Sequence, residues 1–66
     1  MKVSVNGEVC ELPDGITVGA LLESLGAARN GIAVARNERV VRRAEFDTHT
    51  LVDGDTVEII KAVAGG

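Results

Sequence analysis

The sequence of 66 residues is 45% hydrophobic and 26% charged with a formal net charge of −3, which indicates one small soluble domain and excludes an intrinsically disordered chain. It has no apolar stretch of the roughly 20 residues that span a bilayer and no signal-peptide pattern at its start, so we expect a cytoplasmic protein. The negative charge and the single aromatic residue, Phe46, argue against a nucleic-acid partner, and one cysteine with one histidine argues against a metal site.

A β-hairpin is predicted at the start of the chain. Val3 and Val5 alternate with polar residues and are followed by Asn6-Gly7, a dipeptide typical of a two-residue type I′ turn because both of its positions need positive φ. A second strand over 8–12 then pairs with the first, with Val3 opposite Cys10. The buried face of the hairpin comprises Met1, Val3, Val5, Cys10 and Leu12, which makes Cys10 a core residue rather than a reactive thiol.

One amphipathic helix is predicted next. Pro13-Asp14-Gly15 has the composition of a turn, and Thr17 is a suitable N-cap. Apolar residues follow at helical spacing and form one core-facing stripe, which consists of Val18, Leu21, Leu22 and Leu25. This leaves Gly19, Ala20, Glu23 and Ser24 outside the stripe, and it puts Gly26 where a left-handed C-cap is expected.

Three further strands are predicted after the helix. The run 32–35 is short and continuously apolar, as is typical of a strand that is covered on much of both faces. Asn37-Glu38 turns the chain into a short strand over 39–42, and Asp53-Gly54 turns it into the last strand, 56–59. Phe46 is expected to anchor the loop between them in the core. Alternation in the last strand points Val57 inward and Ile60 outward.

These elements describe an α+β fold in which one helix packs on one face of a mixed, four- to five-stranded sheet. The simplest arrangement places the first and last strands side by side and parallel in the middle of the sheet. The residues after the last strand then leave the domain from a central strand.

The sequence closes on Gly65-Gly66. Two glycines make a thin segment that can enter a narrow slot in a partner and present a carboxylate without an obstructing side chain. Glycine-rich chain ends are also common without any such role, so the pair by itself leaves both interpretations open.

Five motifs spread along the chain carry a resemblance to one family: Val3-Ser4-Val5-Asn6-Gly7, the helix segment 17–22, the stretch 34–37, the segment 51–59 with its Asp-Gly-Asp turn, and the ending 62–66. Together they resemble the ubiquitin-like β-grasp sulfur carriers, most closely those of thiamin thiazole biosynthesis, the ThiS family. The chain departs from the family pattern at Glu38, Arg42 and Phe46, where Gly, Pro and Trp are usual. We therefore expect a single β-grasp sulfur-carrier domain over 1–66, with a flexible C-terminal tail at about 62–66.

The resemblance implies a carrier protein and not an enzyme. A ThiF-like adenylyltransferase would use ATP and magnesium to adenylate the Gly66 carboxylate, a persulfide of a sulfur donor protein would displace AMP, and thiazole synthase would take sulfur from the resulting thiocarboxylate. The chain itself would bind no cofactor. Gly65 would provide clearance, Val63 and Ala64 would fill the entrance of the partner's site, and Ile60 is a candidate docking contact.

Other functions stay open. The same chemistry serves the small subunit of molybdopterin synthase and cysteine-pathway sulfur carriers, while a ubiquitin-like modifier would form amide bonds to its targets, and a plain β-grasp binding module would not need Gly66.

The charged residues have simpler interpretations. The cluster of Arg36, Arg39, Arg42 and Arg43 could meet an acidic partner, but a solvated face is the simpler account. Asp53 and Asp55 suit the turn before the last strand. His49 is expected on the surface rather than as a general base, because no nucleophile lies near it in the sequence.

Overall fold

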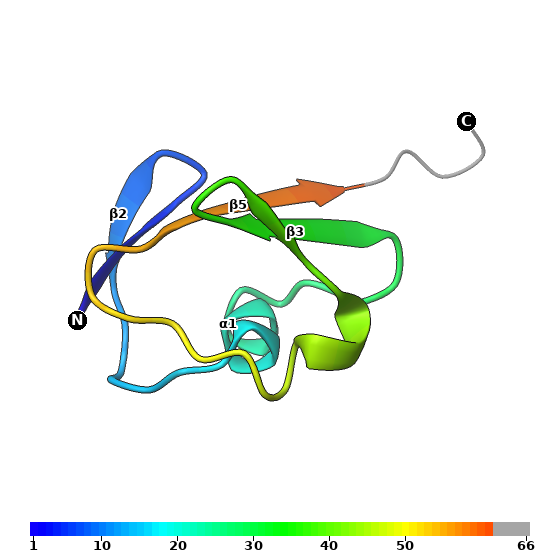
Figure 1. Ribbon diagram of the computed structural model, residues 1–66, viewed down its shortest axis with the longest axis horizontal. Coiled ribbons are helices and arrows are strands. Elements are labelled where there is room, and N and C mark those ends of the chain that lie inside the picture. Colours follow the sequence, from blue (N-terminus) through cyan, green and yellow to red (C-terminus); the bar gives the residue numbers. More distant parts are fainter. Residues whose placement is uncertain (62–66) are drawn as a thin grey trace.

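The computed structural model describes residues 1–61, which form one mixed sheet with a helix beneath it (Figure 1). The strands are β1 (Lys2–Val5), β2 (Glu8–Glu11), β3 (Ile32–Arg36), β4 (Arg39–Val41) and β5 (Thr56–Lys61); the helices are α1 (Val18–Ser24) and the 3₁₀ helix η1 (Arg43–Glu45). The predicted α+β fold, with one α-helix on one face of the sheet, is confirmed.

The sheet has the strand order β2-β1-β5-β3-β4. β1 and β5 are parallel neighbours, as predicted, whereas the other neighbouring strands are antiparallel. The register of the first hairpin is also confirmed, since Val3 pairs with Cys10 and Lys2 with Glu11. Asn6 and Gly7 both have positive φ, 50° and 85°, which is the backbone conformation that a type I′ turn requires.

Helix α1 begins as predicted but ends earlier. The Thr17 hydroxyl accepts a hydrogen bond from the Ala20 amide at 3.1 Å and so satisfies a free donor of the first turn. The helix stops at Ser24, so Leu25 is its C-cap residue and is 51% exposed. The prediction that Leu25 completes the buried stripe is therefore wrong. Gly26 does have the expected left-handed conformation, with φ 68°.

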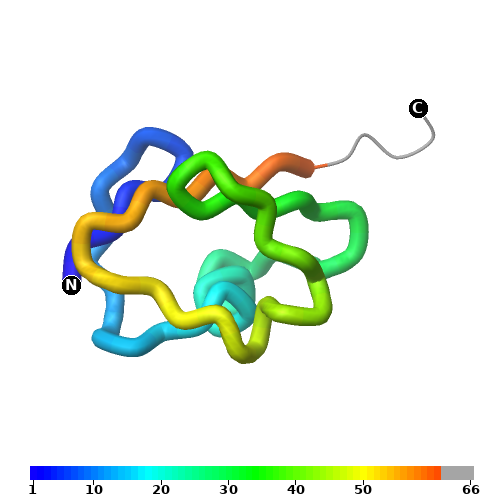
Figure 2. The backbone as a smooth tube through the Cα atoms, viewed as in Figure 1, coloured from blue at the N-terminus to red at the C-terminus, as the bar shows by residue number. Residues whose placement is uncertain are grey.

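Gly19 is buried, which corrects the prediction that it lies outside the apolar stripe. The connection between β4 and β5 crosses this side of α1, as the yellow-green to gold part of the chain shows (Figure 2). The Gly19 amide donates to the Phe46 carbonyl oxygen at 2.8 Å, and the Val18 amide donates to that of His49 at 3.0 Å. The side of α1 at Gly19 is thus covered by a loop that is distant in the sequence.

The core lies between the sheet and α1. Phe46 is its largest side chain and is 1% exposed, which confirms the predicted anchor of the loop. The other fully buried large side chains are Leu21, Leu22, Leu51, Val3, Val18, Val34 and Val57. They come from both layers, so packing of helix on sheet removes one continuous apolar surface from water.

The outer face of the sheet, opposite α1, is open. Ala33 is exposed there, so the prediction that the strand at 32–35 is covered on much of both faces is wrong at this residue. β4 is also shorter than predicted, because Arg42 leaves the strand to become the N-cap residue of η1. Within residues 1–61, no helix has the length and apolar character needed to cross a membrane.

Candidate functional site

The candidate site is the end of β5, from which the chain continues to Gly66. Four of the predicted site residues, Gly66, Gly65, Ala64 and Val63, lie outside the described residues, and Lys61 is the last described one. β5 lies between β1 and β3, and β3 pairs with it as far as Lys61. The strand that leads to the predicted sulfur-carrying residue is therefore a central strand.

Ile60 lies on the open outer face of the sheet, as the alternation predicts, and is 57% exposed. It pairs across the strands with Ala33, which is also exposed. On the same face, Val40 of β4 is 76% exposed and lies opposite Ala35. We call Ala33, Val40 and Ile60 the outer patch; sequence reasoning had singled out only Ile60. Val40 could have been found from its alternation with Val41 in the predicted strand.

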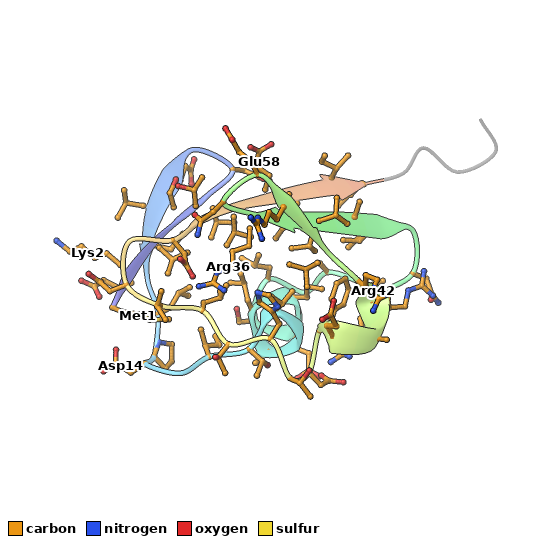
Figure 3. The ribbon with its side chains drawn as sticks, in the orientation of Figure 1. Met1, Lys2, Asp14, Arg36, Arg42 and Glu58 are labelled. Carbon is orange, nitrogen blue, oxygen red and sulfur yellow. The ribbon has the colours of Figure 1, made fainter. Side chains whose placement is uncertain are left out.

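One acidic residue borders the outer patch. Glu58 precedes Ile60 by two positions in β5 and therefore shares its face, and it pairs across the strands with Ala35. Figure 3 shows the Glu58 side chain pointing away from α1, while Arg36 points to the helix side. The outer face thus combines apolar side chains with a carboxylate.

A groove lies on the opposite face of the sheet, between the first hairpin and the end of α1. It has a volume of about 530 Å³ and is lined by Val5, Asn6, Glu8, Cys10, Leu25, Gly26, Ala27, Ile59 and Lys61. Cys10 is half-buried and packs against the core, in agreement with the predicted structural role. No three potential metal-ligating residues come together within residues 1–61.

Asp55 is buried and takes part in a polar cluster at the start of β5. One carboxylate oxygen accepts from Arg36 Nε at 2.7 Å and from the Val52 amide at 2.8 Å, and the other accepts from Asn37 Nδ2 at 3.0 Å. Burial raises the pKa of Asp55, but the hydrogen bonds from Arg36, Val52 and Asn37 together hold it below its usual value. Asp55 is therefore an ionised structural residue.

Arg36 does not belong to a solvated arginine face, which corrects that prediction for one of the four arginines. Its side chain is half-buried and ion-paired to Asp55. Its Nη1 atom also lies 3.1 Å from His49 Nε2. Because a guanidinium group can only donate, His49 Nε2 is the acceptor in this contact.

His49 is half-buried rather than fully on the surface, since it packs beside Arg36. Arg39, Arg42 and Arg43 are exposed, as a solvated face requires. Arg42 lies 3.6 Å from Glu45 and Arg43 donates to Asn30 at 3.4 Å. These contacts are weak at the surface, and the charged groups of this region are accounted for without a catalytic role.

Several known proteins are similar to this chain in sequence. The model of the ThiS family matches residues 3–66. A sulfur carrier protein ThiS from Escherichia coli is 33% identical over 66 residues, which cover the whole of both chains. A thiazole synthase from Magnetococcus marinus is 36% identical over the whole of this chain. This chain spans about a fifth of the length of that thiazole synthase, 20%.

The fold is similar as well. The crystal structure of a thiamine biosynthesis protein (ThiS) from Geobacter metallireducens superposes on this chain with a TM-score of 0.86 and 33% sequence identity, and all of both chains is covered.

Proposed function

Since the chain belongs to the ThiS family of sulfur carriers, we propose that it supplies sulfur for thiamin thiazole synthesis as a thiocarboxylate on Gly66. The observation that carries the proposal is the extent of the family match, which runs through Gly66. The Escherichia coli carrier is also matched along its whole length, so Gly66 aligns with the end of a protein named for sulfur carriage.

The chemistry requires activation by a partner. A carboxylate is a poor electrophile, and we propose that an adenylating enzyme with ATP and magnesium converts the Gly66 carboxylate into an acyl-adenylate, with release of pyrophosphate. A persulfide then displaces AMP, and a second thiol cleaves the acyl disulfide to leave the thiocarboxylate. The chain acts here as a cosubstrate, and the enzymes that act on it supply the catalytic groups.

The proposed roles of the neighbouring residues follow from their size. Gly65 has no side chain to obstruct the approach of a nucleotide or a persulfide to Gly66. Val63 and Ala64 are small apolar residues, which lose little side-chain entropy when they are ordered in a partner's channel. The central position of β5 supports this proposal, because a strand held on both sides is a firm base for such a segment.

Thiazole synthase is the proposed sulfur acceptor. The Magnetococcus marinus relative bears that name. One part of that protein, 20% of its length, is 36% identical to this chain. Joining a carrier-like part to a synthase in one polypeptide raises the effective concentration of one for the other. We infer that a thiazole synthase is the partner that takes sulfur from this chain.

We propose that the outer patch is the docking surface for the adenylating enzyme, with Ile60 as its main contact. Ile60 is 57% exposed at the strand that leads to Gly66, so docking there would place the partner near the reacting carboxylate. Val9 provides a matched control, because it is 72% exposed on the same face but lies on the edge strand β2. We expect Ile60→Asp to weaken binding about tenfold or more and Val9→Asp by less than about threefold, measured by calorimetric titration with the adenylating enzyme.

The function is tested by intact-mass measurement. The chain is incubated with a ThiS-type adenylating enzyme, ATP, magnesium and a persulfide donor. We expect a mass increase that corresponds to the exchange of one oxygen for sulfur, which requires ATP and is absent when one residue is added after Gly66. An unchanged mass, while the same enzyme charges its own carrier, would refute the proposal.

The thiocarboxylate form is then given to different acceptors. Thiazole formation with thiazole synthase and its substrates supports the proposed pathway. Transfer to a molybdopterin precursor or to a cysteine-pathway acceptor alone would assign the chain to another sulfur pathway, and covalent conjugates with larger proteins would identify a modifier.

A further inference from the structure

Asn6 holds the end of β5 on the side where β1 has already stopped. β1 and β5 are parallel, and they pair at two positions, Ser4 with Thr56 and Val5 with Val57. β1 ends at Val5, and Asn6 turns away with φ 50°, in the left-handed region. β5 nevertheless continues to Lys61. The backbone of β5 beyond Val57 therefore needs other partners on this side.

The Asn6 carboxamide supplies these partners. The Asn6 backbone N–H group donates to the Val57 carbonyl oxygen at 2.9 Å. The Asn6 side-chain oxygen accepts from the Ile59 backbone N–H group at 2.7 Å, and the Asn6 side-chain nitrogen donates to the Ile59 carbonyl oxygen at 3.3 Å. One acceptor and one donor are thus presented to Ile59, as two successive peptide groups of a neighbouring parallel strand would present them. The side chain extends the ladder where the backbone of β1 no longer does.

A second asparagine holds the opposite end of the same strand. Asn37, in the hairpin between β3 and β4, also has φ 50°. The Asn37 side-chain oxygen accepts from the Thr56 backbone N–H group at 2.9 Å, and the Asn37 backbone N–H group donates to the Thr56 carbonyl oxygen at 2.7 Å. β5 is therefore fixed at Thr56 by one hairpin turn and at Ile59 by the other. Asn6 holds the end that leads to Gly66.

We propose that Asn6 is a positioning residue for the activation of Gly66; this inference rests on the proposed function. With Asn6 in place, β5 is held on both sides up to Ile59, and the direction in which the chain leaves the domain is fixed. Without the carboxamide, the last part of β5 is paired only with β3. Backbone held on one side opens locally more often, so a docked carrier would present its carboxylate in the productive position for a smaller fraction of the time.

The test uses Asn6→Gly, with Asn37→Gly as its control. Glycine adopts positive φ without strain, so both variants keep their turns. Asn6→Gly loses the two side-chain bonds to Ile59, and Asn37→Gly loses the side-chain bonds to Thr56 and Asp55, so the control is destabilised at least as much as the test variant. The rate of ATP–pyrophosphate exchange by the adenylating enzyme is measured against carrier concentration. We expect Asn6→Gly to lower kcat about tenfold, which corresponds to about 1.4 kcal/mol, with KM within about twofold because the outer patch is unchanged. Asn37→Gly should leave both parameters within about twofold of the original chain.

Amide hydrogen exchange gives a readout that does not depend on the enzyme. We expect faster exchange at Ile59 in Asn6→Gly and at Thr56 in Asn37→Gly, since each amide loses its acceptor. The inference is overturned if the Ile59 amide exchanges hydrogen at the same rate in Asn6→Gly as in the original chain. It is also overturned if this hydrogen exchange is faster in Asn6→Gly but kcat is unchanged. An equal fall of kcat in both variants would overturn it too, because it would indicate lost stability alone. If the original chain itself supports no pyrophosphate exchange, the proposed function fails first, and the positioning role fails with it.

Discussion

Replacement of Asp55 by asparagine should destabilise the protein strongly, although the two side chains have nearly the same shape. Asp55 is 4% exposed and accepts from Arg36, Asn37 and the Val52 amide. An asparagine whose oxygen faces Arg36 and Val52 keeps these two bonds without the negative charge. Its amino group then faces the amino group of Asn37, so a donor meets a donor.

The size of the loss follows from these contacts. Hydrogen bonds to a charged group are worth about 1 kcal/mol more than neutral ones, and a buried donor left without an acceptor costs about 1–3 kcal/mol. The two weakened bonds and the lost one together give about 3–5 kcal/mol. A chain of 66 residues has a free energy of unfolding of only about 3–10 kcal/mol, so the variant should be close to unfolding.

The loss should depend on pH with a definite sign. The pKa of Asp55 is lower in the folded chain than in the unfolded one. Ionisation of Asp55 therefore stabilises the fold fully at a pH above its pKa in the unfolded chain, about 3.9. This stabilisation is lost as the pH falls through the pKa that Asp55 has in the folded chain. The difference in unfolding free energy between the original chain and Asp55→Asn should therefore be constant from about pH 7 to about pH 5 and shrink below about pH 4.

Urea denaturation followed by circular dichroism over this pH range measures the difference. Glu58→Gln is the control for removal of a charge, because Glu58 is exposed, and its loss should change stability by less than about 0.5 kcal/mol. A loss below about 1 kcal/mol for Asp55→Asn at neutral pH, or one that does not diminish in acid, would contradict this account of the cluster.

Three further substitutions test the packing and the caps by the same denaturation assay. Phe46→Ala empties the largest buried position and should cost about 3–5 kcal/mol, enough to leave much of the protein unfolded; a loss under about 2 kcal/mol would refute the anchoring role. Thr17→Ala removes the acceptor of the Ala20 amide and should cost about 1 kcal/mol, whereas an unchanged stability would show that the cap contributes nothing. Gly19→Ala would put a Cβ atom 2.5 Å from Asp47 Oδ1 and 2.6 Å from Arg29 Nη2, so the ends of these flexible side chains must shift, which should disrupt their ion pair. The gain in helix propensity should largely offset the loss of this surface ion pair, so the stability should change little. The pKa of Asp47, which the hydrogen bond from Arg29 lowers, should rise toward its usual value in a titration followed by NMR; an unchanged pKa would show that the pair persists.

Local patterns were sufficient for much of the fold. Asn6-Gly7 fixes the first hairpin, because a two-residue turn leaves only one register, and the observed pairing of Val3 with Cys10 is the predicted one. The Thr17 cap and the left-handed Gly26 were found in the same way. At the candidate site, alternation in the last strand put Ile60 on the outer face, where it is 57% exposed.

Errors arose where the environment of a residue comes from distant parts of the chain. Helical spacing puts Leu25 on the apolar stripe, but α1 ends at Ser24, and Leu25 as its C-cap residue is 51% exposed. The apolar spacing predicts Gly19 outside the stripe, but Gly19 is buried because the loop at Phe46 crosses it. Closeness in the sequence groups Arg36 with Arg39, Arg42 and Arg43, whereas its partner Asp55 is 19 positions further along the chain.

The sequence by itself determined the turns, the faces of the strands and the family of the chain, since these depend on backbone preferences and on the order of apolar and polar residues over short distances. Only the tertiary structure decided how β5 is held, because the partners of Ile59 and Thr56 are side chains of Asn6 and Asn37, which come from two different hairpins. Both asparagines suit their turns, and nothing in a turn motif specifies which strand its side chain meets once the sheet has formed.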